Sequence, residues 1–207
     1  MDESDLRNRG FGSTSLLNRL RGLRVVVCCP DNPEREELIL NLQRFGFKME
    51  TCWPPLESIT EDIDLVFLAI VPRGVIPAWA LERDSRRAAL IAIIGYENPT
   101  IMNSVLRISA EGVVASPIRQ FGLLATIVLS LQIFEHHQSM MKQVRRLELK
   151  LIGIKQVHEA KLIIMNARNV SEEQSYKILR EEAMARRMTV ESLARTIVEA
   201  NKIFLHL

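Results

Sequence analysis

Five short apolar runs that alternate with segments of helical periodicity constrain the fold of this chain more than any other feature. Each run is followed by proline or glycine within a few residues, as expected for strands that are buried on both faces. The runs cover residues 23–29, 48–52, 63–71, 88–94 and 112–115, and helical periodicity covers residues 34–45, 78–87 and 100–110 between them. Strands that alternate with helices predict a doubly wound, five-stranded parallel sheet, and we expect the flavodoxin-like strand order.

After this α/β region the pattern changes to all-α. Neither glycine nor proline occurs between Leu123 and Ile152, which predicts one long helix. Alternating steps of three and four residues along it define a heptad seam: Ile133, His137, Met140, Val144, Leu147, Leu151 and Ile154. This spacing predicts a two-chain coiled coil, although the histidine and the methionine are poor seam residues and leave an intramolecular partner open.

Residues 158–200 predict three short helices. Asn169 and Val170 break the first helix, and Ser171 with Gln174 forms a capping box for the second. Thr189 is the expected N-cap of the third helix. We therefore predict four regions: a mobile N-terminal arm (1–22), a sheet domain (23–122), a coiled-coil linker (123–157) and a helical domain (158–207).

Composition excludes several classes of protein. The net charge is only +2, so overall charge alone does not indicate a nucleic-acid-binding protein. Three cysteines, with no second pair or histidine cluster at metal-ligand spacing, argue against a disulfide framework or a zinc site. We find no signal peptide and no apolar run approaching the ~18 residues of a membrane span, and expect a soluble cytoplasmic protein without a cofactor.

The strand-and-turn pattern resembles a response-regulator receiver domain, in which acidic residues, a phosphoacceptor aspartate, a hydroxyl and a lysine lie at successive strand ends. The corresponding positions here hold none of these groups, apart from a hydroxyl at the lysine position: Cys28, Cys29, Ala69, Ile94 and Ser116. A methyl group cannot accept phosphate, and magnesium requires oxygen ligands. This predicts a degenerate phosphorylation site. Asp31 or Asp64 could supply a carboxylate only after a shift of register.

Residues 158–200 resemble the ANTAR domain of transcription antitermination regulators. The resemblance rests on Ala160-Lys161, Ser171-Glu172-Glu173, Tyr176, Leu179-Arg180, Ala183-Met184 and Arg186-Arg187. Ser175 departs from the alanine that is usual in the family. The resemblance implies RNA contacts by Ala160, Lys161, Tyr176, Arg180, Ala183, Met184, Arg186 and Arg187. Small side chains permit close approach, cations reach phosphates, and a tyrosine ring can stack on an unpaired base.

The chain as a whole resembles the AmiR/NasR-type antitermination regulators. This implies a homodimer that captures paired hairpins in a leader mRNA, and a ligand-sensing partner, similar to a solute-binding protein, that sequesters it until an inducer such as a small amide binds. Two alternatives stay open: a DNA-binding response regulator and a dimeric interaction scaffold. Because the sequence contains no phosphate loop, nucleophile elbow or dinucleotide fingerprint, we do not expect an enzyme.

Overall fold

The computed structural model describes residues 20, 22–72 and 74–205. The predicted N-terminal arm therefore lies outside the described residues, apart from Leu20 and Gly22. The chain divides into two compact units, one ending at Gln138 and the other beginning at Ser139. Within the described ranges, none of the helices combines the length and apolar character that crossing a bilayer requires.

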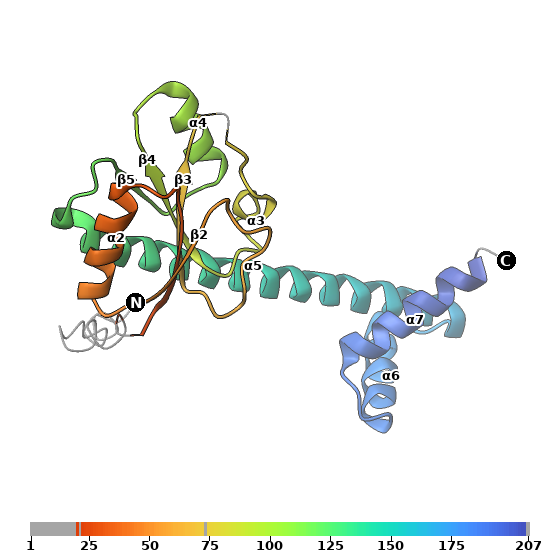
Figure 1. Ribbon diagram of the computed structural model, residues 1–207. Helices are drawn as coiled ribbons and strands as arrows, with labels where there is room; N and C mark the ends of the chain where they lie inside the picture. Colours follow the sequence, from red (N-terminus) through yellow and green to blue (C-terminus); the bar gives the residue numbers. More distant parts are fainter. Residues whose placement is uncertain (1–19, 21, 73, 206–207) are drawn as a thin grey trace, which may run out of the picture. The chain divides into compact units, whose positions relative to one another are not determined.

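The first unit is built on a five-stranded sheet in the order β2-β1-β3-β4-β5, and every neighbouring pair is parallel (Figure 1). Its strands are β1 (Arg24–Cys28), β2 (Lys48–Cys52), β3 (Leu65–Ile70), β4 (Ala89–Ile94) and β5 (Gly112–Ala115). Every strand lies within a run predicted from the sequence, and the flavodoxin-like order is confirmed.

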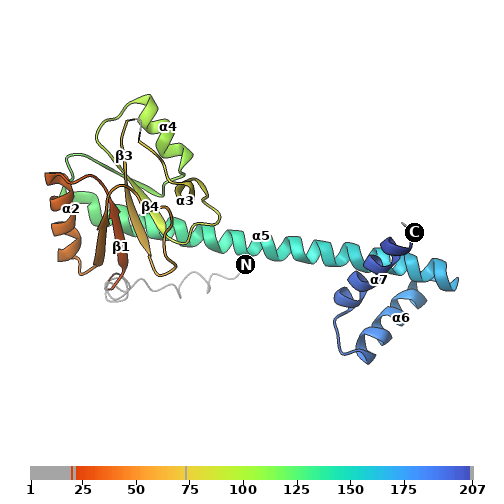
Figure 2. The same ribbon diagram turned by 45° about the vertical axis from the view of Figure 1, so that its right-hand side comes forward.

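Helices cover both faces of this sheet (Figures 1 and 2). Helix α2 (Pro33–Arg44) and the start of α5 (Gln120–Arg168) lie on one face, and α3 (Ala78–Leu81) and α4 (Pro99–Arg107) lie on the other. Asn32 and Asn98 cap α2 and α4, since each side chain accepts a backbone N–H three residues later and a proline follows at the first helical position. These caps explain why both helices begin directly after an asparagine.

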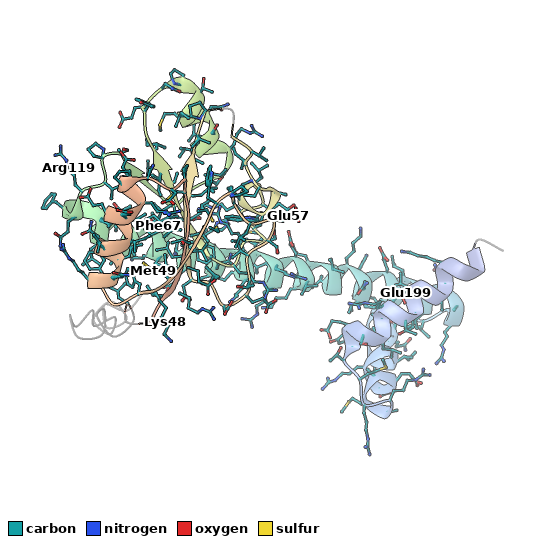
Figure 3. All side chains as sticks on the ribbon, viewed as in Figure 1. Lys48, Met49, Glu57, Phe67, Arg119 and Glu199 are labelled. Atoms are coloured by element: carbon teal, nitrogen blue, oxygen red, sulfur yellow. The ribbon has the colours of Figure 1, made fainter. Side chains whose placement is uncertain are left out.

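Alternate residues of each central strand fill two cores. Phe67 packs with α2 and α5 on one face and lies deep among the side chains of this unit (Figure 3). Leu68 packs with α3 and α4 on the opposite face. Both are at most 1% exposed, which shows that these strands are buried on both faces, as the apolar runs predict.

The helix predicted over residues 78–87 is wrong in length. Helix α3 ends at Leu81, because Glu82 leaves helical geometry at φ −99° and ψ 73°. The following residues direct the Arg86 guanidinium into the protein, where it binds both carboxylate oxygens of Glu111 at 2.7 and 2.9 Å. The same guanidinium donates to the carbonyl oxygen of Ile108 at 2.9 Å. This buried ion pair replaces the last turns of the predicted helix.

Helix α5 (Gln120–Arg168) continues from the first unit into the second. Phe121 and Gly122 are not helical, so the uninterrupted helix starts at Leu123, as predicted. The predicted division between a linker helix and a separate short helix at residues 157 and 158 is not seen, because the helix runs through this point to Arg168. Asn169, at φ 54°, follows its last residue in the left-handed conformation.

Helices α6 (Glu172–Ala185) and α7 (Val190–Leu205) complete the second unit. The capping box before α6 is confirmed: the Ser171 hydroxyl accepts the Gln174 N–H at 3.3 Å, and the Gln174 side chain accepts the Ser171 N–H at 3.2 Å. Thr189 accepts the Ser192 N–H at 3.2 Å, as expected of an N-cap. A small core joins α5, α6 and α7: Ala160, Ile164, Leu179, Ala183, Leu193, Ala194 and Val198.

Candidate nucleic-acid interface

The carboxyl ends of β1, β3 and β4 surround a pocket of about 120 Å³, where a receiver domain would carry its phosphorylation site. Cys29 and Ala69, two members of the predicted degenerate site, line this pocket. The nearby carboxylates are engaged elsewhere, since Asp31 forms an ion pair with Arg35 and Glu34 accepts a hydrogen bond from Ser116. The pocket is therefore lined by apolar groups, a thiol and three polar side chains, those of Asn32, Glu34 and Arg35, and its carboxylate already has a partner.

Two predicted members of the degenerate site lie elsewhere. The Ile94 side chain is buried in the core under α4, and Ile93 and Gly95 line the pocket instead. The Cys28 side chain points away from the pocket, and its sulfur lies 2.8 Å from that of Cys52. Strand alternation explains both corrections, because neighbouring residues of a strand face opposite sides of the sheet.

The thiols at this end of the sheet are poor nucleophiles. Burial raises the pKa of Cys29 to about 11, and burial together with the neighbouring Cys52 raises the pKa of Cys28 further. Both thiols are therefore protonated at neutral pH, whereas thiol chemistry requires the thiolate. Asp64 supplies no substitute carboxylate, because it accepts the Arg24 backbone N–H at 2.9 Å beside the first residues of β1 and β3.

In the helical unit, the two alanines of the predicted RNA set lie in the core. Ala160 is 0% exposed and Ala183 is 1% exposed, and both pack among α5, α6 and α7. The prediction that these side chains contact RNA is therefore wrong for this structure. Their small size has another role, because it lets the three helices approach one another closely.

Lys161 and Tyr176 line one groove. The Lys161 ammonium lies 2.5 Å from a carboxylate oxygen of Glu172, which joins α5 to the first turn of α6. This hydrogen bond and the lysine charge lower the pKa of Glu172. Tyr176 is 45% exposed, so one part of its ring is packed and the rest is available to a ligand.

The remaining members of the predicted set lie on the surface of α6 and just after it. Tyr176, Arg180 and Met184 recur at every fourth residue and therefore share one helix face. Arg186 is engaged by Glu182, with 2.8 Å between Nε and Oε1. Arg187 is exposed and has φ 55°, in the turn that leads to α7. The structure thus leaves five of the eight predicted residues exposed and Lys161 partly exposed.

The groove that contains Lys161 and Tyr176 has a volume of about 1120 Å³ and lies between α5, α6 and α7. Basic side chains dominate its polar lining: Lys142, Arg145, Arg146, Lys150, His158, Lys161 and Arg195. Glu191 is the acidic residue that lines it. The sequence alone did not indicate that the α5 cations line a groove, because a linear pattern does not show that α7 folds back beside them.

Gly153 sets the close approach of α7 to α5. A Cβ atom at this position would lie 3.2 Å from Cγ of Glu191, which is tighter than an ordinary van der Waals contact. The glycine is buried by this contact although it lies on a helix surface. It therefore allows the first turn of α7 to form one wall of the groove.

The seam predicted along α5 is exposed in this chain. Within the second unit, its members are between 44% and 67% exposed: Met140, Val144, Leu147, Leu151 and Ile154. Ile133 is 45% exposed in the first unit. His137 differs, since its Nε2 lies 2.9 Å from Asp84 of the same chain. Apart from this histidine, the seam forms an apolar stripe with no covering element described in its own chain.

The fold and the groove together define a response-regulator-like protein with a degenerate receiver and a helical output domain. Residues 23–131 match the family model described as AmiR, N-terminal, and residues 145–198 match that of the ANTAR domain. The chain therefore belongs to the AmiR family and is an AmiR/NasR-type regulator with an ANTAR domain, as the sequence resemblance indicated.

Two known proteins illustrate the relationship. The chain is 28% identical over 190 residues to the aliphatic amidase regulator of Pseudomonas aeruginosa, covering 91% of this chain and 97% of that protein. It is also similar to the solved structure of the response regulator StyR, with a TM-score of 0.52, 18% identity and coverage of 86% of this chain and 99% of the other. The second similarity shows the fold alone.

Proposed function

We propose that this antitermination regulator acts by binding RNA, capturing two adjacent hairpins of a leader transcript and so preventing a terminator from forming. The observation that carries the proposal is that Tyr176 and Lys161 line the same cation-rich groove of an ANTAR domain. A half-exposed aromatic ring beside cations is the combination that binds unpaired bases and their phosphates.

The proposed target is RNA rather than duplex DNA. An RNA loop presents unstacked bases to which Tyr176 can bind, whereas duplex DNA keeps its bases stacked. A helix-turn-helix protein reads duplex DNA with the first residues of its recognition helix. Helix α7 begins instead with Val190 and Glu191, neither of which is an asparagine, glutamine or arginine that reads base edges.

A homodimer is the second part of the proposal. The exposed stripe of α5 has the heptad spacing that a second copy of the same helix would cover. Two chains carry two grooves, and a target with two hairpins would occupy both. The seam is thus the feature that supports dimerisation and, with it, a paired RNA target.

We further propose that a partner protein, rather than phosphorylation, controls the regulator. The pocket at the degenerate site contains Ala69 where a phosphoacceptor would lie, and its nearby carboxylates have partners within the chain. A ligand-sensing protein similar to a solute-binding protein is the expected partner, and a small amide is a candidate inducer, since the Pseudomonas relative is an amidase regulator. Acetyl phosphate with Mg²⁺ should leave RNA affinity unchanged.

The test is a comparison of purified full-length protein on RNA with two adjacent hairpins and on duplex DNA of matched length, by fluorescence anisotropy. We expect preference for RNA, and a loss of about 1–3 kcal/mol in binding free energy for Tyr176→Ala, because stacking on one base contributes that much. Tyr176→Phe keeps the ring and should bind like the wild type. Equal binding of RNA and DNA, or of no nucleic acid, would overturn the proposal in favour of a DNA-binding regulator or an interaction scaffold.

A further inference from the structure

We infer that the RNA site extends along α5, well before the residues that the ANTAR motif singles out, and that this helix holds the phosphate backbone of the hairpin stem. The cations assigned to this role are Lys142, Arg145, Arg146 and Lys150. The inference deepens the proposed function and rests on it, since it names the part of the RNA that each end of the groove contacts.

The groove is continuous from the proposed loop-binding residues to these cations. Lys161 and Tyr176 line the same groove as Lys142 and Arg146. Because an α-helix rises 1.5 Å per residue, Lys142 and Lys161 are separated by about 28 Å along α5. A site of this length exceeds what a single base and its phosphate need. It suits a hairpin whose loop contacts Tyr176 and whose stem follows α5.

The four α5 cations line the groove without a neutralising partner, whereas three other basic residues of the unit are paired with glutamates. Lys161, Lys177 and Arg186 each have a glutamate within 4.0 Å. In the part of the chain that the structure describes, Lys142, Arg145, Arg146 and Lys150 form no ion pair or hydrogen bond, and all four are exposed. Charges without an internal partner are available to phosphates, and each phosphate bound releases condensed counterions.

Most of the groove and most of the heptad seam occupy different sides of α5. At 3.6 residues per turn, the groove-lining residues between 142 and 153 point on average roughly 170° away from the line of Met140, Val144 and Leu151. Ile154 belongs to both surfaces, because this seam residue also lines the groove. A second α5 on the seam would therefore leave most of the groove open. The proposed dimer would carry one accessible groove on each protomer.

RNA fits this surface better than an acidic protein segment does. Both would satisfy the cations, but an acidic peptide gives no role to the half-exposed Tyr176 ring in the same groove. An A-form stem is recognised mainly through its backbone and shape, and an adjoining loop through stacked bases. The cations on α5 therefore suit the backbone of the stem, and the ring on α6 suits the bases of the loop.

The test uses the full-length triple variant Arg145→Gln/Arg146→Gln/Lys150→Gln and the RNA with two hairpins. We expect at least about a tenfold loss of affinity near physiological salt, and a reduction of about 2 in the slope of log K against log salt, because each lost phosphate contact removes about 0.7–0.9 from that slope. The difference between variant and wild type should shrink when the stems are shortened while the loops are kept. Hydroxyl-radical footprinting should show stem protection lost and loop protection retained.

Lys155→Gln is the matched control, because Lys155 is exposed on the same helix and does not line the groove. It should bind RNA like the wild type, and sedimentation velocity and circular dichroism should show both variants with wild-type assembly and helicity. If the triple variant binds RNA normally while Tyr176→Ala binds weakly, the stem assignment is overturned and the proposed function stands. If wild-type protein binds no hairpin RNA, both fail.

Discussion

The two units use basic side chains in opposite ways. In the sheet unit Arg86 is 6% exposed and is fixed by Glu111 and by backbone carbonyl oxygens. In the helical unit Arg145 and Arg146 are exposed and line a groove in which Glu191 is the acidic residue. A cation that is buried among internal partners serves the fold, whereas a cation that lines an open groove is available to a ligand. The comparison separates structural charge from binding charge.

The units also differ in what they retain of their families. The sheet unit keeps the strand order of a receiver, while Ala69 and Cys29 lie where its chemistry would require oxygen ligands. The helical unit keeps Lys161 and Tyr176 accessible in a groove. Architecture depends on apolar faces that many residues share, whereas phosphoryl chemistry depends on a few particular groups. Loss of those groups leaves the fold intact.

The largest expected effect concerns the seam. Leu147 and Leu151 are 59% and 67% exposed, and burying a leucine side chain contributes about 1.5–3 kcal/mol. Leu147→Ser/Leu151→Ser removes four leucines from a dimer, about 6 kcal/mol at the lower figure, and should raise its dissociation constant about ten-thousandfold, as measured by sedimentation equilibrium. RNA with two hairpins should lose its advantage over RNA with one, while affinity for a single hairpin stays unchanged. A variant that remains dimeric would contradict the proposal that the seam forms the dimer interface.

A smaller effect is expected from the buried ion pair. Glu111→Ala leaves the buried Arg86 guanidinium without the carboxylate that it binds. Burial disfavours the charged guanidinium and lowers its pKa. Removing one partner of a buried pair costs about 3–5 kcal/mol in the free energy of unfolding. Urea unfolding of the sheet unit, followed by circular dichroism, measures this loss.

The matched control for that substitution is Glu61→Ala. Its carboxylate pairs with Arg87, and both side chains are well exposed, at 77% and 63%. Exposed pairs contribute about 0–1 kcal/mol, so this variant should unfold almost like the wild type. Similar losses for Glu111→Ala and Glu61→Ala would mean that the buried pair is no more structural than the surface pair, and the contrast between the units would fail.

Local sequence patterns predicted the elements that depend on local physics. Apolar runs predicted the strands, Ser171 predicted the start of α6, and the absence of glycine and proline predicted the long helix. The length of α3 was not predictable in this way. It depends on the pairing of Arg86 with Glu111, which are 25 residues apart in the sequence.

The candidate site was only partly predictable for a related reason. The family motif indicated Lys161 and Tyr176, which the structure brings into one groove. The motif did not distinguish them from Ala160 and Ala183, because spacing along a helix does not show which side a neighbouring helix covers. The α5 cations required knowledge of where α7 lies, which the close contact at Gly153 and the shared core of α5 and α7 show.

The smallest expected effect is at Ser175, the departure from the usual alanine. Its side chain is 0% exposed, and its hydroxyl donates to the Glu172 carbonyl oxygen at 2.7 Å. Ser175→Ala loses a hydrogen bond of about 1 kcal/mol and gains part of that through the higher helix propensity of alanine, so stability should change by less than about 1 kcal/mol. RNA affinity should not change, because a buried side chain cannot touch the ligand. Ser175→Leu, by contrast, overfills the site and should cost about 1–3 kcal/mol of stability. If Ser175→Ala altered RNA affinity severalfold at unchanged stability, residues of the helical core would also determine recognition, and binding could no longer be assigned to exposed groups alone.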